Sequence, residues 1–402
     1  MQTLQPKASP ALGPRAAATF RAAGRWLWEN LFSPWYNALL TALCLWLLYA
    51  AGRALWHWVL VEANWAVIPP NLRLFLAGTY PRDQLWRIAA AVYGILFLSG
   101  LSAGAFGGKS LRWAAALGGA AALTLLLPSL SLGLRALLAA GAALIAAGFF
   151  LARGRRRLRP WLAAGWFLSF PITMALMWGH PGLAFLPRVE TSSWGGLTLT
   201  LLLAVTGIAA SFPLGVLLAL GRQSSLPVVS VVCAAYIEVI RGLPLITILF
   251  MAHLTLPLFL PDLRIDRVVR AMIGLTAFTA AYMAENVRGG LQGVPRGQIE
   301  AAQALGLNAT LTTLLIVLPQ ALRAVIPSIV GQFISLFKDT SLVAIIGLLD
   351  LLGVARGVIA NPAWLGLQAE VFAFAALLYW IFSYALSRAS VRVERALGGG
   401  RV

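Results

Sequence analysis

Residues that could do chemistry inside an apolar environment are concentrated in the second half of this chain. Ionisable side chains within apolar segments are costly to bury and commonly mark solute pathways. The six candidates lie at the ends of two apolar stretches and are Glu285, Asn286, Lys338, Asp339, Thr340 and Ser341. We expect them along the path of a polar or zwitterionic solute, which needs both carboxylates and cations. Interfacial caps or structural ion pairs would explain both groups equally well.

Motifs for catalysis, metal binding or nucleotide binding are weak by comparison. His57, His180 and His253 are scattered, without a second ligand at metal-binding spacing. The stretch AGAFGGKS at 103–110 resembles a phosphate-binding loop, but Ala103 replaces the first glycine. It also lies between span-length apolar runs, where a strand and a helix would be needed. We therefore predict no catalytic residues, no metal site and no nucleotide site on this chain.

The composition is that of a membrane protein. Of 402 residues, 60% are hydrophobic and 11% are charged, whereas charged residues make up about a quarter of a typical soluble domain. Crossing the hydrocarbon core takes about 20 helical residues. The sequence predicts an all-α, polytopic fold with about ten transmembrane helices, at roughly 35–60, 88–106, 113–130, 132–152, 161–180, 195–220, 242–261, 270–287, 322–344 and 366–386.

The net charge of +18 is explained by the orientation of the chain in the membrane and does not indicate nucleic-acid binding. Its basic residues gather in short connections between apolar runs, such as RGRRRLR at 153–159, as the positive-inside rule describes. These connections alternate with loops of mixed charge. We predict a multi-pass membrane protein, in contact with the lipid bilayer, with both termini in the cytoplasm.

The chain divides into parts of different character. Residues 1–34 form a basic cytoplasmic segment, and 35–190 form an extension of about five spans with little intramembrane polarity. Residues 191–390 carry the polar motifs, and 391–402 form a cytoplasmic tail.

A short polar helix interrupts the apolar runs at VPRGQIEAAQALG, residues 294–306. Pro295 suits the first turn of a helix, Gly306 suits the left-handed residue beyond its end, and Asn308 suits the cap of the next helix. A helix with so few large apolar residues buries little by itself. We expect it either to occupy a groove on another protein or to remain solvated.

The stretch EAAQALGLNATLTTLLIVLP, with Glu300, Gly306 and Pro319, resembles the EAA loop of importer-type ABC permeases. The surrounding sequence is similar to that of polar amino acid permeases over about 191–390. It includes YIEVIRGLPLITILF at 236–250 and SLFKDTSLVAIIGLL at 335–349. The longer N-terminal region resembles that of permease subunits of general L-amino acid importers. An ABC permease bundle is the fold that this resemblance implies for the C-terminal half.

The resemblance also implies a location in the bacterial inner membrane, as well as partners and residue roles. The partners would be an ABC ATPase subunit holding ATP and Mg, a second permease subunit and a periplasmic amino-acid-binding protein; the substrate would be an L-amino acid. Coupling to the ATPase would run through the loop near 294–319, at Glu300, Ala301, Ala302, Gly306 and Pro319.

Four further residues, Glu238, Arg241, Gly242 and Pro244, have an expected structural or gating role. Glu238 and Arg241, at i and i+3, predict an intrahelical ion pair. Gly242 and Pro244 predict a helix break there. Two other classes of function compete: an ion-gradient-driven secondary amino acid transporter, and a membrane scaffold that transports nothing.

Overall fold

The structure, a computed structural model, describes residues 25–26, 28–106, 132–259, 261–262 and 265–396. The regular structure of these residues is helical, and one isolated β-bridge joins Gly196 and Asp350. The chain forms two compact units, Met1–Trp65 and Ala66–Val402. The all-α prediction is confirmed.

The first unit contains one long helical segment. A π-helical turn, Trp28–Phe32, precedes α2 (Trp35–His57), which runs on into the π-helical turn Trp58–Glu62. None of the α2 side chains is buried within the chain. The segment Trp35–Glu62 is long and apolar enough to cross a membrane, so its surface suits lipid.

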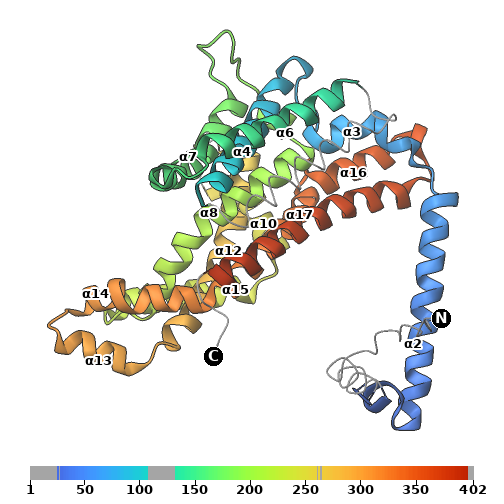
Figure 1. The fold of residues 1–402 in the computed structure, drawn as a ribbon. Helices are drawn as coiled ribbons and strands as arrows, with labels where there is room; N and C mark the ends of the chain where they lie inside the picture. The colour runs from blue at the N-terminus through green and yellow to red at the C-terminus, as the bar shows by residue number, and fades with distance from the viewer. Residues whose placement is uncertain (1–24, 27, 107–131, 260, 263–264, 397–402) are drawn as a thin grey trace, which may run out of the picture. The chain divides into compact units, whose positions relative to one another are not determined.

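The second unit begins at Ala66, within the 3-10 turn Trp65–Val67, and is a bundle of helices (Figure 1). Its longer helices are α3 (Ile68–Ala77), α4 (Leu85–Phe106), α6 (Leu132–Ala152), α7 (Arg159–Trp178), α8 (Gly196–Arg222), α9 (Pro227–Gly242), α12 (Arg267–Gln292), α13 (Arg296–Ala304), α15 (Leu318–Asp339), α16 (Leu351–Ile359) and α17 (Gln368–Ala396). Shorter pieces are α10 (Leu245–Phe250), α11 (Leu256–Phe259) and α14 (Ala309–Leu311), with a π-helical turn at Met251–Thr255.

Seven helical segments of the described residues have the length and composition of a membrane span, or up to eight with one bent pair. The expected count of ten is therefore approximate. The expected span at 113–130 lies outside the described residues. The expected span at 270–287 falls within α12, which is not among the seven. Because α12 packs against α8, α9 and α15, much of its surface faces protein and does not need lipid-compatible side chains.

The bent pair lies at a predicted break. Helix α9 ends at Gly242, and Pro244 is the N-cap of α10, so the two segments meet at 109°. Proline cannot donate the backbone hydrogen bond that a continuous helix would need there. Helix α9 itself is missing from the expected spans, since its range falls between two of them.

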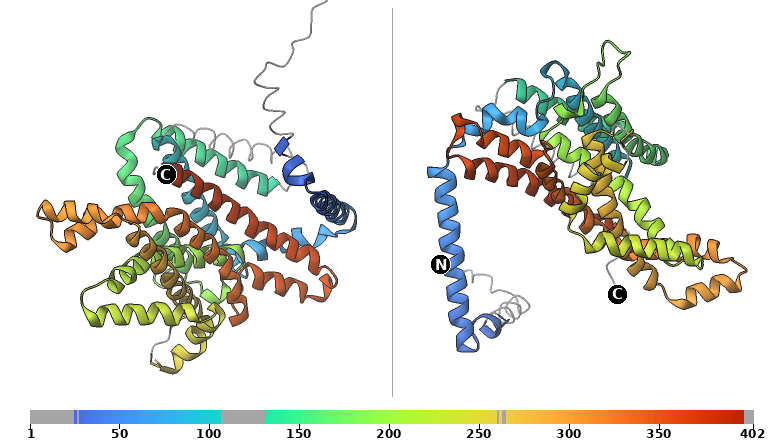
Figure 2. Two further views of the ribbon diagram at one scale, coloured as in Figure 1. Left: turned by 90° about the horizontal axis from the view of Figure 1, so that it is seen from below. Right: turned by 180° about the vertical axis from the view of Figure 1, so that it is seen from behind.

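Two ends of the bundle can be distinguished (Figures 1 and 2). Helices α13 and α14 project at one end, which we call the α13 end. At the other, which we call the α3 end, the Thr198 hydroxyl near the start of α8 donates to the carbonyl of Leu76 in α3 (2.8 Å). Helices α8 and α12 run the length between these ends and form the centre of the bundle.

Residues on both sides of position 190 pack against one another. Ala77, Tyr80 and Met177, from the N-terminal side of that boundary, share a buried cluster with Leu199 and Leu275. The N-terminal helices from α3 onward therefore pack as part of one body with the helices that follow.

Candidate functional site

The α13 hairpin is built by local capping. Pro295 has extended backbone angles (φ −60°, ψ 136°) and precedes the nine helical residues Arg296–Ala304. Gly306 has a φ of +80°, a conformation that glycine adopts without steric cost. Its N–H donates to the Gln303 carbonyl (2.9 Å), and the Leu307 N–H donates to the Ala302 carbonyl (3.1 Å), which together form a Schellman cap.

The next helix starts directly after this cap. The side chain of Asn308 accepts a hydrogen bond from the Leu311 N–H (2.9 Å), as the sequence predicts. A π-helical turn at Thr312–Val317 then leads into α15, where Pro319 is the second residue. Proline lacks the N–H that would bond to the preceding turn, and in membrane helices local π adjustments can satisfy the backbone groups that proline leaves free.

The two faces of α13 differ in what they contact. Ala302 is 3% exposed, and Ile299 packs against the cluster at the α13 end that includes Val287. Glu300 and Ala301 are exposed, and Leu305 is 82% exposed. Ala302 therefore faces inward, although it was expected to meet a partner. The sequence analysis did not identify Leu305 as an exposed apolar residue of this hairpin. Its position directly after the short polar helix and directly before Gly306 is the signal that could have identified it.

An ion-pair cluster joins three helices near the α13 end. The Glu285 carboxylate on α12 accepts from Arg288 (2.7 Å) and from Arg222 at the end of α8 (2.8 Å), and lies 3.5 Å from Arg241 on α9. Arg222 also donates to Glu238 (2.9 Å). The predicted Glu238–Arg241 pair is wrong, because Arg241 reaches Glu285 while Glu238 reaches Arg222.

Burial differs within this cluster. The Glu285 side chain is 15% exposed, whereas that of Glu238 is 61% exposed. Three guanidinium groups surround the one carboxylate of Glu285, so that carboxylate already has its hydrogen-bond partners in this conformation. The residue ties α8 and α9 to α12, about two turns before the α13 hairpin.

The six expected solute-path residues fall into two separate groups. Glu285 and the half-buried Asn286 lie on α12 toward the α13 end, and Lys338–Ser341 lie where α15 ends, toward the α3 end. At 1.5 Å per residue along antiparallel α12 and α15, the groups are roughly 20 Å apart. Within one chain, they do not form a single site.

The second group is itself varied. Lys338 is exposed, Asp339 and Ser341 are half-buried, and Thr340 is fully buried with its hydroxyl donating to the Phe337 carbonyl (2.7 Å). Thr340 is therefore oriented by its own helix, whereas Lys338 remains accessible.

A buried polar network at the α3 end was not anticipated. Asp350 is fully buried and accepts from the Gly353 N–H (2.9 Å) and the Tyr379 hydroxyl (3.0 Å). The Leu351 N–H donates to the Thr200 hydroxyl of α8 (3.0 Å). Burial raises the pKa of Asp350 to about 6, against the lowering effect of its hydrogen bonds. The network fixes the start of α16 against α8 and α17.

Comparison with known proteins identifies a family of membrane transport proteins. Residues 211–399 match the model of the family described as binding-protein-dependent transport system inner membrane component. The inner membrane amino-acid ABC transporter permease protein YhdY of Escherichia coli (strain K12) is 41% identical over 94% of this chain and 93% of its own length. The glutamate/glutamine/aspartate/asparagine transport system permease protein BztC of Rhodobacter capsulatus is 39% identical over 96% of each.

The chain belongs to the amino-acid ABC transporter permease family. A crystal structure of an amino acid ABC transporter with histidines is 29% identical and covers 50% of this chain and 92% of its own, with a TM-score of 0.45. The alignments with YhdY and BztC cover 94% and 96% of this chain, so these two relatives also share most of the region before residue 190 of this permease.

Membership also bears on the alternatives. The permease is a transport component and not an enzyme, and ATP-driven transport is favoured over the ion-gradient carrier and the scaffold. Within the described residues, no group of three or more His, Cys, Asp or Glu side chains could hold a metal ion. The second half of the loop-like stretch 103–110, residues 107–110, lies outside them.

Proposed function

We propose that this permease is the membrane-spanning subunit of an ATP-driven importer that carries L-amino acids across the bacterial inner membrane. The observation that carries the proposal is the α13 hairpin, a capped helix with an open face that projects from the bundle (Figure 1). A helix presented in this way suits a groove on a partner, as amphipathic helices commonly bind. The partner would be an ABC ATPase subunit, which would hold the ATP and Mg.

On the open face, three residues have different roles. Leu305, which is 82% exposed in this chain, would fill an apolar pocket of the ATPase, because its burial there would remove apolar surface from water. Glu300 would form a polar contact that sets orientation, and Ala301 would allow close approach. Gly306 and Pro319 would act indirectly, because they shape the turn and the helix that follows.

Transmission to the membrane would run through α12. The α13 hairpin joins α12 to α15, and the Glu285 cluster links α12 to α8 and α9. A push on α13 would therefore move three helices together. Gly242 and Pro244, at the 109° bend after α9, would let α10 change angle with little cost.

The solute contacts would lie toward the α3 end. Lys338 and Asp339 offer a cation and a carboxylate for the two charges of an amino acid, and Ser341 offers a hydroxyl. The carboxylate of Glu285 is already matched by three arginines, so a structural role suits it better. A periplasmic binding protein would deliver the amino acid, and a second permease subunit would complete the pathway.

Orientation follows from the same proposal. With the α13 end at the ATPase, that end is cytoplasmic and the α3 end is periplasmic. Residues 1–34 and 391–402 would then be cytoplasmic, 35–190 would be a membrane extension, and 191–390 would be the transporting domain.

Affinity purification of the tagged permease from its native membrane tests this proposal. We expect an ATPase and a second permease to co-purify. Glu300→Lys should lose the ATPase and keep the second permease, whereas Thr310→Lys, an exposed position on α14, should keep both. Recovery of the chain alone, or retention of the ATPase and of uptake by Glu300→Lys, would overturn the coupling role of α13.

A further inference from the structure

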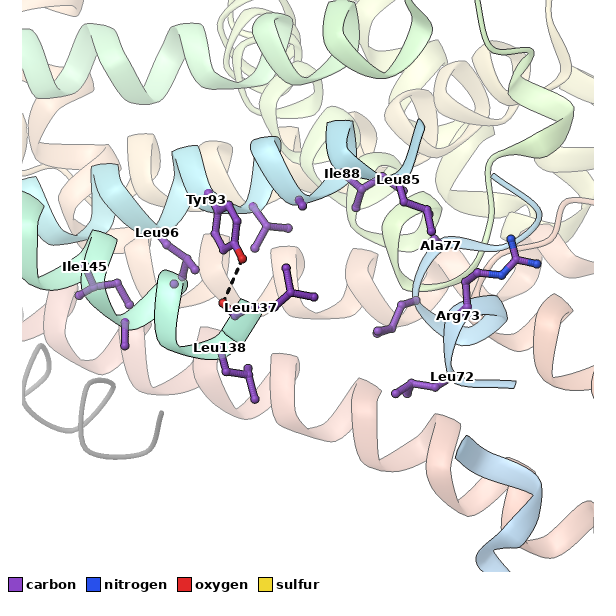
Figure 3. Close-up of a pocket in the computed structure, with 15 residues that line it drawn as sticks. Leu72, Arg73, Ala77, Leu85, Ile88, Tyr93, Leu96, Leu137, Leu138 and Ile145 are labelled. Carbon is purple, nitrogen blue, oxygen red and sulfur yellow. Dashed lines mark hydrogen bonds between the residues drawn. The ribbon is translucent and has the colours of Figure 1, made fainter. Parts of the chain in front are cut away.

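An apolar groove of about 690 Å³ lies between α3, α4 and α6, away from the α13 hairpin (Figure 3). This volume is in the range of ligand pockets in proteins, about 300–1,000 Å³. Its walls are almost wholly aliphatic, with Leu85, Ile88 and Leu96 from α4 among them. Neither the coupling role of α13 nor the solute path uses this groove.

Packing of α4 against α6 creates the groove. Toward the far ends of both helices, a Cβ on Gly100 would lie 2.2 Å from the Ile145 carbonyl oxygen, so the two backbones are in close contact there. Nearer to their starts, side chains separate the helices. The Tyr93 hydroxyl donates to the Leu137 carbonyl (3.0 Å), and Gly141 faces Tyr93 and Leu96. The helices diverge from the Gly100 contact toward α3, and the groove is the space between them.

The length of the groove matches one leaflet of a bilayer. Leu85 to Leu96 are eleven helical steps, or about 16 Å at 1.5 Å per residue. Half of a hydrocarbon core of about 30 Å is about 15 Å. Helices α4 and α6 both have the length and composition of membrane spans, so the solvent expected around them is lipid.

A cation lies at one end of this groove. Arg73 of α3 is at the end where α4 begins, and Leu96 and Ile145 are at the other end (Figure 3). The Arg73 guanidinium donates to the Tyr80 carbonyl (3.3 Å) and forms no ion pair with any carboxylate among the described residues. Guanidinium has five donors and binds phosphate well, so donors remain for a ligand at the level of lipid head groups.

We propose that this groove is a binding site for one phospholipid molecule of the leaflet at the α3 end. An acyl chain would lie along α4 from Leu85 to Leu96, and the head-group phosphate would accept hydrogen bonds from Arg73. The lipid would fill the space between α4 and α6 and so join α3 to both helices. The site does not depend on the transport function.

Photolabelling of the purified full-length permease in vesicles of phosphatidylethanolamine and phosphatidylglycerol tests the site. The probe is a phosphatidylglycerol with a diazirine at the end of one acyl chain, and labelled peptides are identified by mass spectrometry. We expect labelling to concentrate near Leu96 and Ile145, where the chain end would lie. Ala89→Phe, which fills the groove, should remove this labelling. Ala90→Phe, a neighbouring exposed position outside the groove, should not.

The phosphate contact has its own test. Arg73→Gln should reduce labelling of the groove about fivefold at limiting probe, as expected for the loss of one cation near a lipid head group. Arg82→Gln, an exposed arginine at the same end, should leave it unchanged. A diacylglycerol probe with the same chains should show no difference between Arg73→Gln and the unmodified protein.

Two results would overturn the proposal. One is uniform labelling, in which the groove is labelled no more than the exposed face of α17 and Ala89→Phe has no effect. The other is exclusion of the probe from the groove by another protein segment, seen as protein cross-links from a photoreactive residue at position 89. Size-exclusion profiles of each variant separate these results from misfolding.

Discussion

Replacement of Glu285 by glutamine tests whether this residue is structural or contacts the solute. The carboxylate accepts three hydrogen bonds from Arg288 (2.7, 3.0 and 3.1 Å) and one from Arg222 (2.8 Å). Each hydrogen bond to a charged group is worth about 1.5–3 kcal/mol. Glutamine keeps one neutral acceptor, and the arginine side chains are 25–35% exposed, so water recovers part of the loss. We expect a net loss of roughly 2–3 kcal/mol in the free energy of unfolding.

The assay is thermal unfolding of the purified permease in detergent, with Glu238→Gln as the matched control. Glu238 has one ion pair and a side chain that is 61% exposed, so its loss should cost less than about 1 kcal/mol. A clearly lower unfolding midpoint for Glu285→Gln than for Glu238→Gln supports the structural role. Equal midpoints, together with a loss of uptake only in Glu285→Gln, would refute it and return Glu285 to the solute path.

Three further predictions concern other parts of the chain. Leu305→Asp should reduce co-purification of the ATPase at least tenfold while the permease remains in the membrane. The reason is that burial of an unpaired carboxylate in the ATPase groove costs more than about 1.4 kcal/mol. Gly100→Ala should lower the thermal unfolding midpoint, because its Cβ would lie 2.2 Å from the Ile145 carbonyl, whereas Gly94→Ala, with nothing within 4 Å, should not. Because burial raises the pKa of Asp350 from 3.8 to about 6, the folded state holds this proton more tightly. The free energy of unfolding should therefore fall by roughly 2.4 kcal/mol from pH 4 to pH 7. Asp350→Asn should remove that part of the pH dependence. The prediction would be contradicted if thermal unfolding of Asp350→Asn and of the unmodified permease depended on pH in the same way.

Local signals explain why the α13 hairpin could be predicted. Pro295, Gly306 and Asn308 act through their own backbone and nearest neighbours, so their spacing alone determines where helices end and begin. The break at Gly242–Pro244 was predictable for the same reason. The inward face of Ala302 was not, because it depends on how the hairpin lies against the end of the bundle.

Contacts between distant residues explain what the sequence could not reveal. Arg222 reaches Glu285 across 63 positions of the chain, so the spacing of Glu238 and Arg241 suggested a pair that a nearer tertiary partner replaces. Asp350 has the residue type of a helix N-cap, but its burial depends on Tyr379, 29 positions later. The separation of Glu285 from Lys338 likewise follows from the antiparallel packing of α12 and α15.

Uptake by the reconstituted complex tests the central claim most directly. The permease would be purified with its co-purifying partners, placed in proteoliposomes with a periplasmic amino-acid-binding protein outside and ATP inside, and supplied with a labelled L-amino acid. We predict uptake that requires ATP, persists with an uncoupler and is lost in Glu300→Lys. Uptake that continues without ATP and collapses with the uncoupler would contradict the assignment of ATP-driven transport through α13.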